Sequence, residues 1–592
     1  MIKILSKSLR DYKKGSILTV LLSILEAAFE ILIPLCMAKV IDDGIDMGNM
    51  KAVWRYGIYL LVFAFFQLVT GVLSAHVAAR ASAGFSANLR QDMYDNVQTF
   101  AFSNIDKFST ASIVTRLTTD VTNIQNAYQM LIRMAIRGPI MLVFSMIVSF
   151  QINHTVAWIF LAVIPLMALL LFWIIKKVNP IMNRVFHTYD ELNNVVQENV
   201  RGIRVVKSFH REDYEIGKFK SISENIYRDF AKGERLIAFN SPIMQFFMYV
   251  CMILISWIGA KAILSSGNDA ARGMTTGDLT ALFSYAMQIL MSLMMLSMVF
   301  VMITISLASA RRIAEILSEK TDISNPMHPV MTVKDSTIRF EHVDFVYASK
   351  ADKKVLDDIN LSIAPGETIG IIGGTGSSKS SLVQLIPRLY DVANGRVTLG
   401  GIDVRSYDID TLRNAVAMVL QKNELFSGTI KENLRWGNEH ATDEEIVQAC
   451  KLACADEFIR AFPEQYDTHI EQGGSNVSGG QKQRLCIARA LLKKPRVLIL
   501  DDSTSAVDTK TDAYIQKSFA EYIPDTTKII IAQRVSSVQY ADQIVVLDDG
   551  KIIAVGKHDA LLETCDIYRE VYESQKKGES GNDEKRTYAA CK

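Results

Sequence analysis

The sequence predicts an α-helical membrane domain in its first half and an α/β domain in its second half. The first half contains six long apolar runs, and a membrane-spanning helix needs about 20 apolar residues. The second half alternates short β-rich runs, such as 368–372, 497–500 and 528–532, with helical stretches. The 592 residues are 49% hydrophobic yet 21% charged, which fits a membrane domain joined to a water-exposed one.

The six apolar runs give the number of predicted spans. They are Ile17–Val40, Tyr56–Ala79, Pro139–Phe150, Val156–Ile175, Pro242–Leu264 and Leu279–Ala308. The third run is short, and it reaches full length only if its helix begins near Met134. Lys and Arg crowd residues 3–14, 80–137 and 176–235, so the positive-inside rule places both termini and both long loops in the cytoplasm.

Predicted domain boundaries follow from these runs. Residues 1–14 are basic and amphipathic, and we interpret them as an interfacial elbow helix. Residues 15–318 form the six-helix membrane domain, whose cytoplasmic loops 80–137 and 176–238 are expected to extend the membrane helices. A linker, 319–336, leads into the α/β domain, 337–573, and the polar tail 574–592 is expected to be disordered.

Charge and cysteine content narrow the classes of partner. The net charge of +1 gives no indication of a nucleic-acid partner. The seven cysteines lack the spacing of zinc sites or redox pairs. They are therefore interpreted as free thiols in a reducing compartment or in lipid.

A glycine-rich loop follows the strand 367–372. The loop and the start of the next helix comprise Gly373, Gly374, Thr375, Gly376, Ser377, Ser378, Lys379, Ser380 and Ser381. Backbone N–H groups of such a loop cradle phosphates, and the helix N-terminus adds positive potential. Lys379 is expected to reach the β- and γ-phosphates of a nucleotide, and Ser380 to bind Mg²⁺. The usual pattern has glycine in place of Ser378.

Two further motifs lie beyond this loop. The apolar strand 497–500 ends in Asp501, and a buried strand that delivers a carboxylate to the phosphates is the Walker B arrangement, with Asp501 acting on Mg²⁺. Between the loop and this strand lie Ser478, Gly479, Gly480 and Gln481, which precede a basic helix.

This order of motifs resembles the ABC transporters, specifically the exporter-type half-transporters that include multidrug and lipid exporters. The resemblance covers nearly the whole chain. It implies a six-span ABC exporter transmembrane domain fused to an α/β P-loop NTPase nucleotide-binding domain, with ATP and Mg²⁺ as ligands. It also implies that two nucleotide-binding domains meet head to tail, with each ATP between the P-loop of one and the signature, Ser478–Gln481, of the other.

The resemblance assigns further residues. Tyr347 is similar to the aromatic residue that stacks on adenine, and Gln421 to the Q-loop glutamine that contacts Mg²⁺. Asp508 belongs to a segment that resembles the D-loop. Segments 103–120 and 202–212 resemble coupling loops, in which short helices near 115–118 and 211–214 are expected to transmit domain closure to the membrane helices.

Two departures from the family pattern concern catalysis. Asp502 stands where the family has a glutamate that orients the attacking water, and Gln533 stands where it has a histidine. Aspartate is one methylene shorter than glutamate, so its carboxylate lies further from the attacking water. A misplacement of about 1 Å can lower a rate by on the order of 100-fold. Glutamine in place of histidine cannot carry the charge of an imidazolium. With Ser378, these departures predict a site that binds ATP but hydrolyses it weakly. Because the signature is intact apart from Val477 in place of the commoner leucine, we expect a heterodimer with a second half-transporter; a slow homodimer is the alternative.

Candidate cargo contacts lie in the membrane half. Glu26 and Glu30 share one face of the first span, where they would attract cationic amphiphiles or hydrogen-bond another helix. Met291 and Met295 lie in a methionine-rich sixth span, which suits either varied apolar cargo or ordinary packing. Arg133 and Arg137 are expected at the cytoplasmic edge of the membrane rather than in a substrate path.

Together these features predict ATP-driven export of hydrophobic or amphipathic small molecules across a plasma (inner) membrane, in a bacterium, by one half of a heterodimer. The alternatives are a lipid or peptide exporter subunit, a homodimeric slow ATPase and a regulatory ABC subunit. The six spans exclude a soluble ABC protein.

Overall fold

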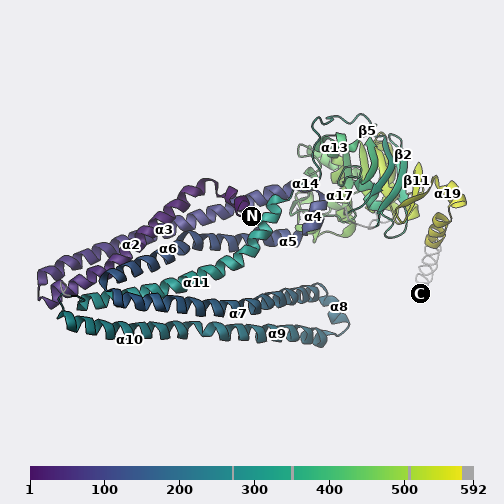
Figure 1. Cartoon of the computed structure of the whole chain (residues 1–592). Helices are drawn as coiled ribbons and strands as arrows, with labels where there is room; N and C mark the ends of the chain where they lie inside the picture. The colour runs from purple at the N-terminus through teal and green to yellow at the C-terminus, as the bar shows by residue number, and fades with distance from the viewer. Residues whose placement is uncertain (270–272, 348–352, 504–508, 577–592) are drawn as a thin grey trace. The chain divides into compact units, whose positions relative to one another are not determined.

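The computed structural model describes residues 1–269, 273–347, 353–503 and 509–576. The chain divides into two compact units (Figure 1). The first comprises Met1–Gln98 and Thr110–Glu319, and the second comprises Thr99–Ser109 together with Lys320–Lys592. A short segment from the membrane half of the sequence is therefore part of the second unit.

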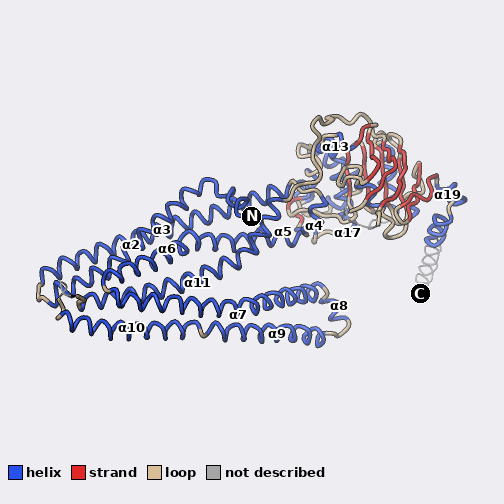
Figure 2. Tube along the Cα trace, in the orientation of Figure 1, coloured by secondary structure: helices blue, strands red, loops and turns tan. Residues whose placement is uncertain are grey.

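The described residues of the first unit form helices joined by short turns, and six of these helical segments are long and apolar enough to cross a membrane (Figure 2). This confirms the prediction of six spans. The helices of the unit are α1 Ile2–Leu5, α2 Lys13–Lys39, α3 Met50–Gln98, α5 Thr110–Thr115, α6 Val121–Ile152, α7 His154–Arg201, α8 Ile203–Ser208, α9 Glu212–Ala238, α10 Asn240–Ser266 and α11 Thr276–Ser318. The third span reaches full length because α6 begins well before Met134.

Several of these helices are longer than a bilayer requires. α3 has 49 residues and α7 has 48. At roughly 1.5 Å per residue each is about 70 Å long, against about 30 Å of hydrocarbon. The long predicted loops are therefore mainly continuations of the membrane helices. The sharp connection between α6 and α7 is capped by Asn153, whose side chain accepts hydrogen bonds from the N–H groups of Thr155 (2.9 Å) and Val156 (3.1 Å).

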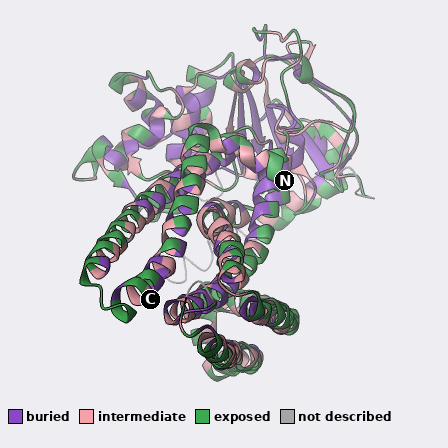
Figure 3. Cartoon of the chain, turned by 60° about the vertical axis from the view of Figure 1, so that its left-hand side comes forward, coloured by how far each residue is buried: buried purple, intermediate pink, exposed green. Residues whose placement is uncertain are grey.

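Large apolar side chains on these helices face outward. Leu61, Phe65, Leu169 and Trp257 are all more than 60% exposed. Figure 3 shows the same contrast along the chain, with mostly exposed long helices and mostly buried strands. In water such a surface would be costly, whereas lipid tails cover it without penalty.

The described residues of the second unit form three sheets. The largest has the strand order β12-β11-β3-β10-β9-β6, in which β12 alone runs antiparallel to its neighbour, and an antiparallel sheet has the order β2-β1-β4-β5. The third pairs β7 with β8. The strands are β1 Ile338–Phe345, β2 Leu356–Ile363, β3 Thr368–Ile372, β4 Asn394–Leu399, β5 Ile402–Asp403, β6 Val416–Val419, β7 Gly428–Thr429, β8 His469–Ile470, β9 Val497–Asp501, β10 Thr527–Ile531, β11 Gln543–Asp548 and β12 Lys551–Gly556.

The six-stranded sheet is covered on both faces, which explains why its strands are continuously apolar. Along β9, Leu498 and Leu500 join one core cluster, and Val497 and Ile499 join the other. The first cluster includes residues of α15, α17 and α18, and the second includes residues of α12, α13 and the antiparallel sheet. The helices are α4 Phe102–Phe108, α12 Lys379–Gln384, α13 Ile409–Ala415, α14 Ile430–Arg435, α15 Asp443–Leu452, α16 Asp456–Arg460, α17 Gly479–Leu492, α18 Thr509–Tyr522 and α19 His558–Thr564.

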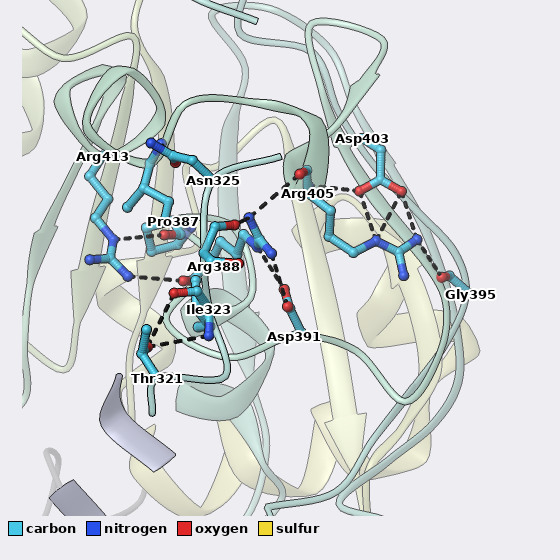
Figure 4. Close-up of polar contacts among 12 residues, drawn as sticks. Thr321, Ile323, Asn325, Pro387, Arg388, Asp391, Gly395, Asp403, Arg405 and Arg413 are labelled. Carbon is cyan, nitrogen blue, oxygen red and sulfur yellow. Dashed lines mark hydrogen bonds and ion pairs between the residues drawn. The ribbon is translucent and has the colours of Figure 1, made fainter. Parts of the chain in front are cut away.

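The predicted linker, 319–336, is attached to the second unit at several points. Arg388 is only 6% exposed; its guanidinium pairs with Asp391 (2.8 Å) and donates to the carbonyl of Ser324 (3.2 Å) (Figure 4). The amide of Asn325 donates to Asp408 (2.7 Å). The linker is therefore part of the folded unit from Lys320 onward.

The short cytoplasmic helices differ from the expected positions. The short helices are α4, Phe102–Phe108, and α8, Ile203–Ser208. Of the expected positions, residues 115–118 lie at the end of α5 and in the π-helical turn that follows it. Residue 211 is the N-cap of the long helix α9, which contains residues 212–214. α4 packs within the second unit: Tyr390 donates to Asp106 (2.8 Å), and the amide of Asn104 donates to the Lys320 carbonyl (3.1 Å).

The end of the chain also differs from expectation. Residues 566–576 are helical, so 574–576 of the predicted disordered tail belong to a folded element. Residues 577–592 lie outside the described part of the chain.

Candidate functional site

The parallel sheet brings the predicted motifs to one edge. In the register of β10 with its neighbours, Ile531 lies beside Ile371 of β3 on one side and Asp501 of β9 on the other. Val419 of β6 pairs with Leu500 of β9. The segments that follow these strands therefore emerge together, and they carry the glycine-rich loop, Gln421, Asp502 and Gln533.

Backbone geometry explains part of the loop sequence. A Cβ on Gly373 would lie 2.1 Å from the carbonyl oxygen of Leu547, so the strand can turn there only with glycine. Gly376 has φ +87°. Ser378 has φ 70° and ψ 22°, the left-handed conformation for which glycine is the usual residue. Gly374 and Thr375 are exposed, which leaves their side of the loop open to a ligand.

Lys379 and Ser380 begin α12. The Lys379 ammonium donates to the carbonyl oxygens of Gly373 (2.9 Å) and Gly374 (2.8 Å) and to the hydroxyl of Ser377 (3.2 Å). Burial lowers the pKa of this ammonium, while Asp501 and Asp502 oppose the shift. The lysine thus sits inside the loop, where a phosphate would replace the carbonyl groups as its partner.

A pair of oxygen ligands lies beside the lysine. The hydroxyl of Ser380 donates to Asp501 (3.0 Å), which is only 3% exposed. Burial raises the pKa of the Asp501 carboxyl, and the hydrogen bond from Ser380 lowers it. Oxygen donors suit Mg²⁺, which usually takes one or two protein ligands and completes its shell with phosphates and water. These residues fit ATP with Mg²⁺, and the bound metal would neutralise charge on the phosphates.

Asp502 is held by two glutamines. Gln533 donates to its Oδ2 from Nε2 at 2.7 Å, and a hydrogen bond with Gln421 lowers the pKa of the carboxyl. Burial is the larger influence and raises that pKa. The side-chain amide of Gln483 also donates to the Asp502 carbonyl (3.2 Å). Asp502 and Gln533, the two residues that depart from the family pattern at catalytic positions, are therefore hydrogen-bonded to each other.

Tyr347 lies next to the P-loop helix. Its hydroxyl is 2.7 Å from that of Ser381, and its ring is 45% exposed. It also meets Tyr390 edge-on, with ring centroids 5.2 Å apart. This position suits stacking on a nucleotide base.

The signature residues form the start of α17. The hydroxyl of Ser478 accepts from the N–H of Gln481 (3.3 Å), and the Gln481 side chain accepts from the N–H of Ser478 (2.9 Å), a capping box. Ser478 and Gly479 are exposed. The N-terminus of a 14-residue helix is thus presented to solvent. The predicted D-loop residue Asp508 lies outside the described residues.

The two carboxylates of the first span, Glu26 and Glu30, have an arginine as their partner. Arg137 of α6 pairs with Glu26 at 3.0 Å and also with Glu30 of the same helix, α2. The pairing joins Arg137 to Glu30 across 107 positions, so spacing in the sequence gives no indication of it. A buried carboxylate needs a counter-charge, and α6 supplies it. Met291 is 62% exposed and Met295 is half-buried.

Two contacts of the site were not foreseen. Gln575, near the end of the described chain, hydrogen-bonds the backbone at Gln533 and Val535. Tyr390 joins Tyr347 to α4. Neither residue belongs to a local motif, so spacing in the sequence offers no signal for either.

The fold and the site define a membrane protein with an ATPase domain of the ABC type. The family descriptions "ABC transporter transmembrane region" and "ABC transporter" match residues 16–294 and 356–505. An uncharacterized ABC transporter ATP-binding protein of Bacillus subtilis, YfiB, is 36% identical over 567 residues, covering 96% of this chain and 97% of that protein. The chain therefore belongs to the ABC transporter family.

Two further similarities are informative. An ATP-dependent lipid A-core flippase of Desulfotalea psychrophila is 32% identical over 543 residues, covering 91% of this chain and 93% of that protein. The solved structure of a bacterial Atm1-family ABC exporter with ATP bound has a TM-score of 0.81 and 23% identity, and the match covers 96% of this chain and 98% of that one. At that identity the likeness supports the fold.

Proposed function

We propose that this chain is one half of a heterodimeric exporter that uses ATP to move hydrophobic or amphipathic small molecules across a bacterial plasma membrane. Its own P-loop would bind ATP and hydrolyse it weakly. Its signature, Ser478–Gln481, would complete a competent ATP site on the P-loop of the partner half-transporter.

The hydrogen bond between Gln533 and Asp502 carries the proposal of weak hydrolysis. Orienting a water for attack requires a carboxylate at the right reach, and aspartate is one methylene shorter than glutamate. Because the Asp502 carboxylate also accepts from both Gln533 and Gln421, part of its capacity to hold a water is already used. Gln533 further lacks the positive charge with which an imidazolium would stabilise the γ-phosphate.

The exposed start of α17 supports the second half of the proposal. Ser478 and Gly479 face solvent at a helix N-terminus, where N–H groups favour a phosphate. A homodimer would pair this signature with an impaired P-loop twice. Pairing it with an unimpaired P-loop of another half-transporter gives one strong site and one weak site.

The contacts of α4 support coupling between ATP binding and the membrane helices. α4 follows the long helix α3, yet it is anchored to the second unit through Asp106 and Asn104. Closure of two nucleotide-binding domains would therefore move α4 and pull on α3. This is the step by which the ATPase cycle would open and close the membrane helices.

A lipid cargo is the second candidate. It is favoured by the similarity to a protein named as a lipid A-core flippase. The apolar character of the membrane unit is compatible with either cargo. A peptide exporter subunit, a slow homodimeric ATPase and a regulatory subunit remain the other candidates.

Replacement of the two departing residues tests the proposal. We expect Asp502→Glu combined with Gln533→His to raise the ATPase rate of the reconstituted chain by roughly 10- to 100-fold, because the carboxylate gains reach and the switch position gains a charge. The measurement is phosphate release in proteoliposomes, with Lys379→Ala as a matched variant that removes phosphate binding.

Co-reconstitution with candidate partner half-transporters tests the assembly. High ATPase activity that appears only with a partner, and that is lost on Ser478→Ala in this chain, supports the heterodimer. Full activity of the chain alone, unchanged by the Asp502→Glu and Gln533→His pair, would show that Asp502 and Gln533 are competent and would overturn both parts of the proposal.

A further inference from the structure

The helix 566–576 at the end of the described chain is firmly anchored in the second unit. Tyr568 is fully buried, and its hydroxyl lies 2.7 Å from Nδ1 of His558. Arg569 donates to the carbonyl oxygens of Leu562 (2.6 Å) and Glu563 (2.8 Å), at the end of α19. The ring of Tyr572 packs against His558, with centroids 5.2 Å apart. This helix is therefore a fixed support rather than a loose terminus.

Gln575, one turn after Tyr572, reaches the segment that follows β10. Its Nε2 donates to the carbonyl oxygen of Gln533 (2.7 Å), and its Oε1 accepts from the N–H of Val535 (2.8 Å). One side-chain amide thus satisfies a carbonyl and an N–H two residues apart in this segment, in the manner of a neighbouring strand. Both bonds are of good length, and Gln575 is half-buried.

The segment that Gln575 contacts, at residues 533 and 535, also reaches the ATP site. The side chain of Gln533 donates to Oδ2 of Asp502, and the N–H of Asp502 donates to the Ile531 carbonyl (3.0 Å). At its far end the segment is held by Gln516, which donates to the carbonyl of Ser537 (2.7 Å). Gln575 therefore fixes the backbone at the residue whose side chain positions Asp502.

We propose that Gln575 is a positioning residue for ATP hydrolysis: it clamps the backbone of Gln533 to the C-terminal helix and so sets the distance of the Gln533 amide from Asp502 and from the γ-phosphate. This deepens the proposed function and rests on it for the effect on hydrolysis. The clamp, which consists of the two hydrogen bonds from Gln575 to the backbone at Gln533 and Val535, can be tested without measuring turnover.

Hydrogen exchange of the full chain tests the clamp. We expect Gln575→Met, which keeps the side-chain length but removes both hydrogen bonds, to speed amide exchange of a peptide covering 533–537 by about fivefold. Glu573→Ala, an exposed change on the same helix, is the matched control and is expected to leave that exchange unchanged. Equal exchange in wild type and Gln575→Met would overturn the clamp.

A double-mutant cycle tests the effect on hydrolysis. Gln575→Met is expected to lower the weak residual turnover of reconstituted protein by about fivefold, because the Gln533 amide loses its fixed distance from the γ-phosphate, while leaving the affinity for trinitrophenyl-ATP unchanged. In a Gln533→Ala background it should lower turnover little further, because the side chain through which it acts is gone. Losses that add fully in the double variant, or a loss of affinity with no loss of turnover, would overturn the positioning role.

These outcomes separate the two proposals. If wild-type turnover stays at background both alone and with a partner, the proposed function fails, and the exchange experiment still decides the clamp. If turnover is normal and the exchange rate at 533–537 does not respond to Gln575→Met, the clamp fails and the proposed function stands.

Discussion

Ser378, the residue directly before Lys379 in the phosphate loop, adopts a left-handed backbone conformation. A residue with a Cβ costs about 1 kcal/mol there relative to glycine. The loop nevertheless closes, because Gly373 and Gly376 take the positions that demand close approach or positive φ. The departure from the family pattern therefore strains the loop without abolishing its shape.

Ser378→Gly should relieve this strain. We expect a gain of up to about 1 kcal/mol in the stability of the second unit, seen as a rise of roughly 2 °C in the midpoint of its thermal unfolding. Ser378→Ala is the matched control: it removes the hydroxyl but keeps the Cβ, so the midpoint should not rise. An equal rise in both variants would show that the hydroxyl, and not the backbone, is the source of the cost.

The immediate neighbours of Asp502 explain the pKa and the orientation of its carboxyl group. Its carboxyl is half-buried, and burial raises its pKa, while Gln421 and Gln533 lower it by hydrogen bonding. A carboxylate held in this way is oriented, yet it is shorter than the usual glutamate. Local sequence shows the substitution, and the structure shows which neighbours hold the Asp502 carboxylate.

Between elements, the contact of α2 with α6 in the membrane unit is polar at its centre. Arg137 joins α6 to Glu26 and Glu30 of α2, and the amide of Gln288 in α11 donates to the Glu30 carbonyl (3.4 Å). Three helices thus meet around two carboxylates. This arrangement favours the structural role that the sequence left open for these residues, and it reduces the charge available to a cationic cargo.

Removal of the arginine should destabilise this junction. Arg137→Met leaves two carboxylates without their counter-charge, and we expect a loss of about 3–5 kcal/mol of stability for breaking a buried ion pair on one side. The measurement is thermal unfolding of the detergent-solubilised chain. Adding Glu26→Gln and Glu30→Gln should restore most of the loss. Unfolding of Arg137→Met at the wild-type temperature would contradict a structural role for the cluster.

At the scale of the whole molecule, nucleotide binding belongs to the second unit, so its free energy adds to the stability of that unit. We expect a non-hydrolysable ATP analogue with Mg²⁺, at about 100 times its dissociation constant, to stabilise this unit by about 2.7 kcal/mol. Addition of EDTA should remove part of this gain, because Asp501 and Ser380 are proposed to bind Mg²⁺.

Asp501→Asn checks this linkage. It should abolish the Mg²⁺-dependent part of the stabilisation while leaving a smaller effect of the nucleotide alone. Asp525→Asn, an exposed change away from the phosphate edge, is the control. A full Mg²⁺ effect in Asp501→Asn would remove Asp501 from the metal site. Calorimetry of the intact chain distinguishes the unfolding of this unit from that of the membrane unit.

Features that depend on neighbours along the chain could be predicted from the amino-acid sequence. The six spans follow from apolar runs of about 20 residues, because a helix in lipid must satisfy its backbone internally. The phosphate loop, Asp501 and the signature follow from short motifs that each form one local structure. Asp502, Gln533 and Ser378 were visible as departures for the same reason.

Contacts between distant segments become visible only in the folded chain. Arg137 lies more than 100 residues from Glu30, and Gln575 lies 42 residues from Gln533. α4 follows a membrane helix in sequence yet packs with the second unit. Such contacts depend on how side chains from different elements meet in space, and neither periodicity nor spacing encodes that meeting. This is why the sequence did not indicate the partners of Arg137. It is also why residues 574–576 were predicted in a disordered tail, whereas the structure shows them in a helix.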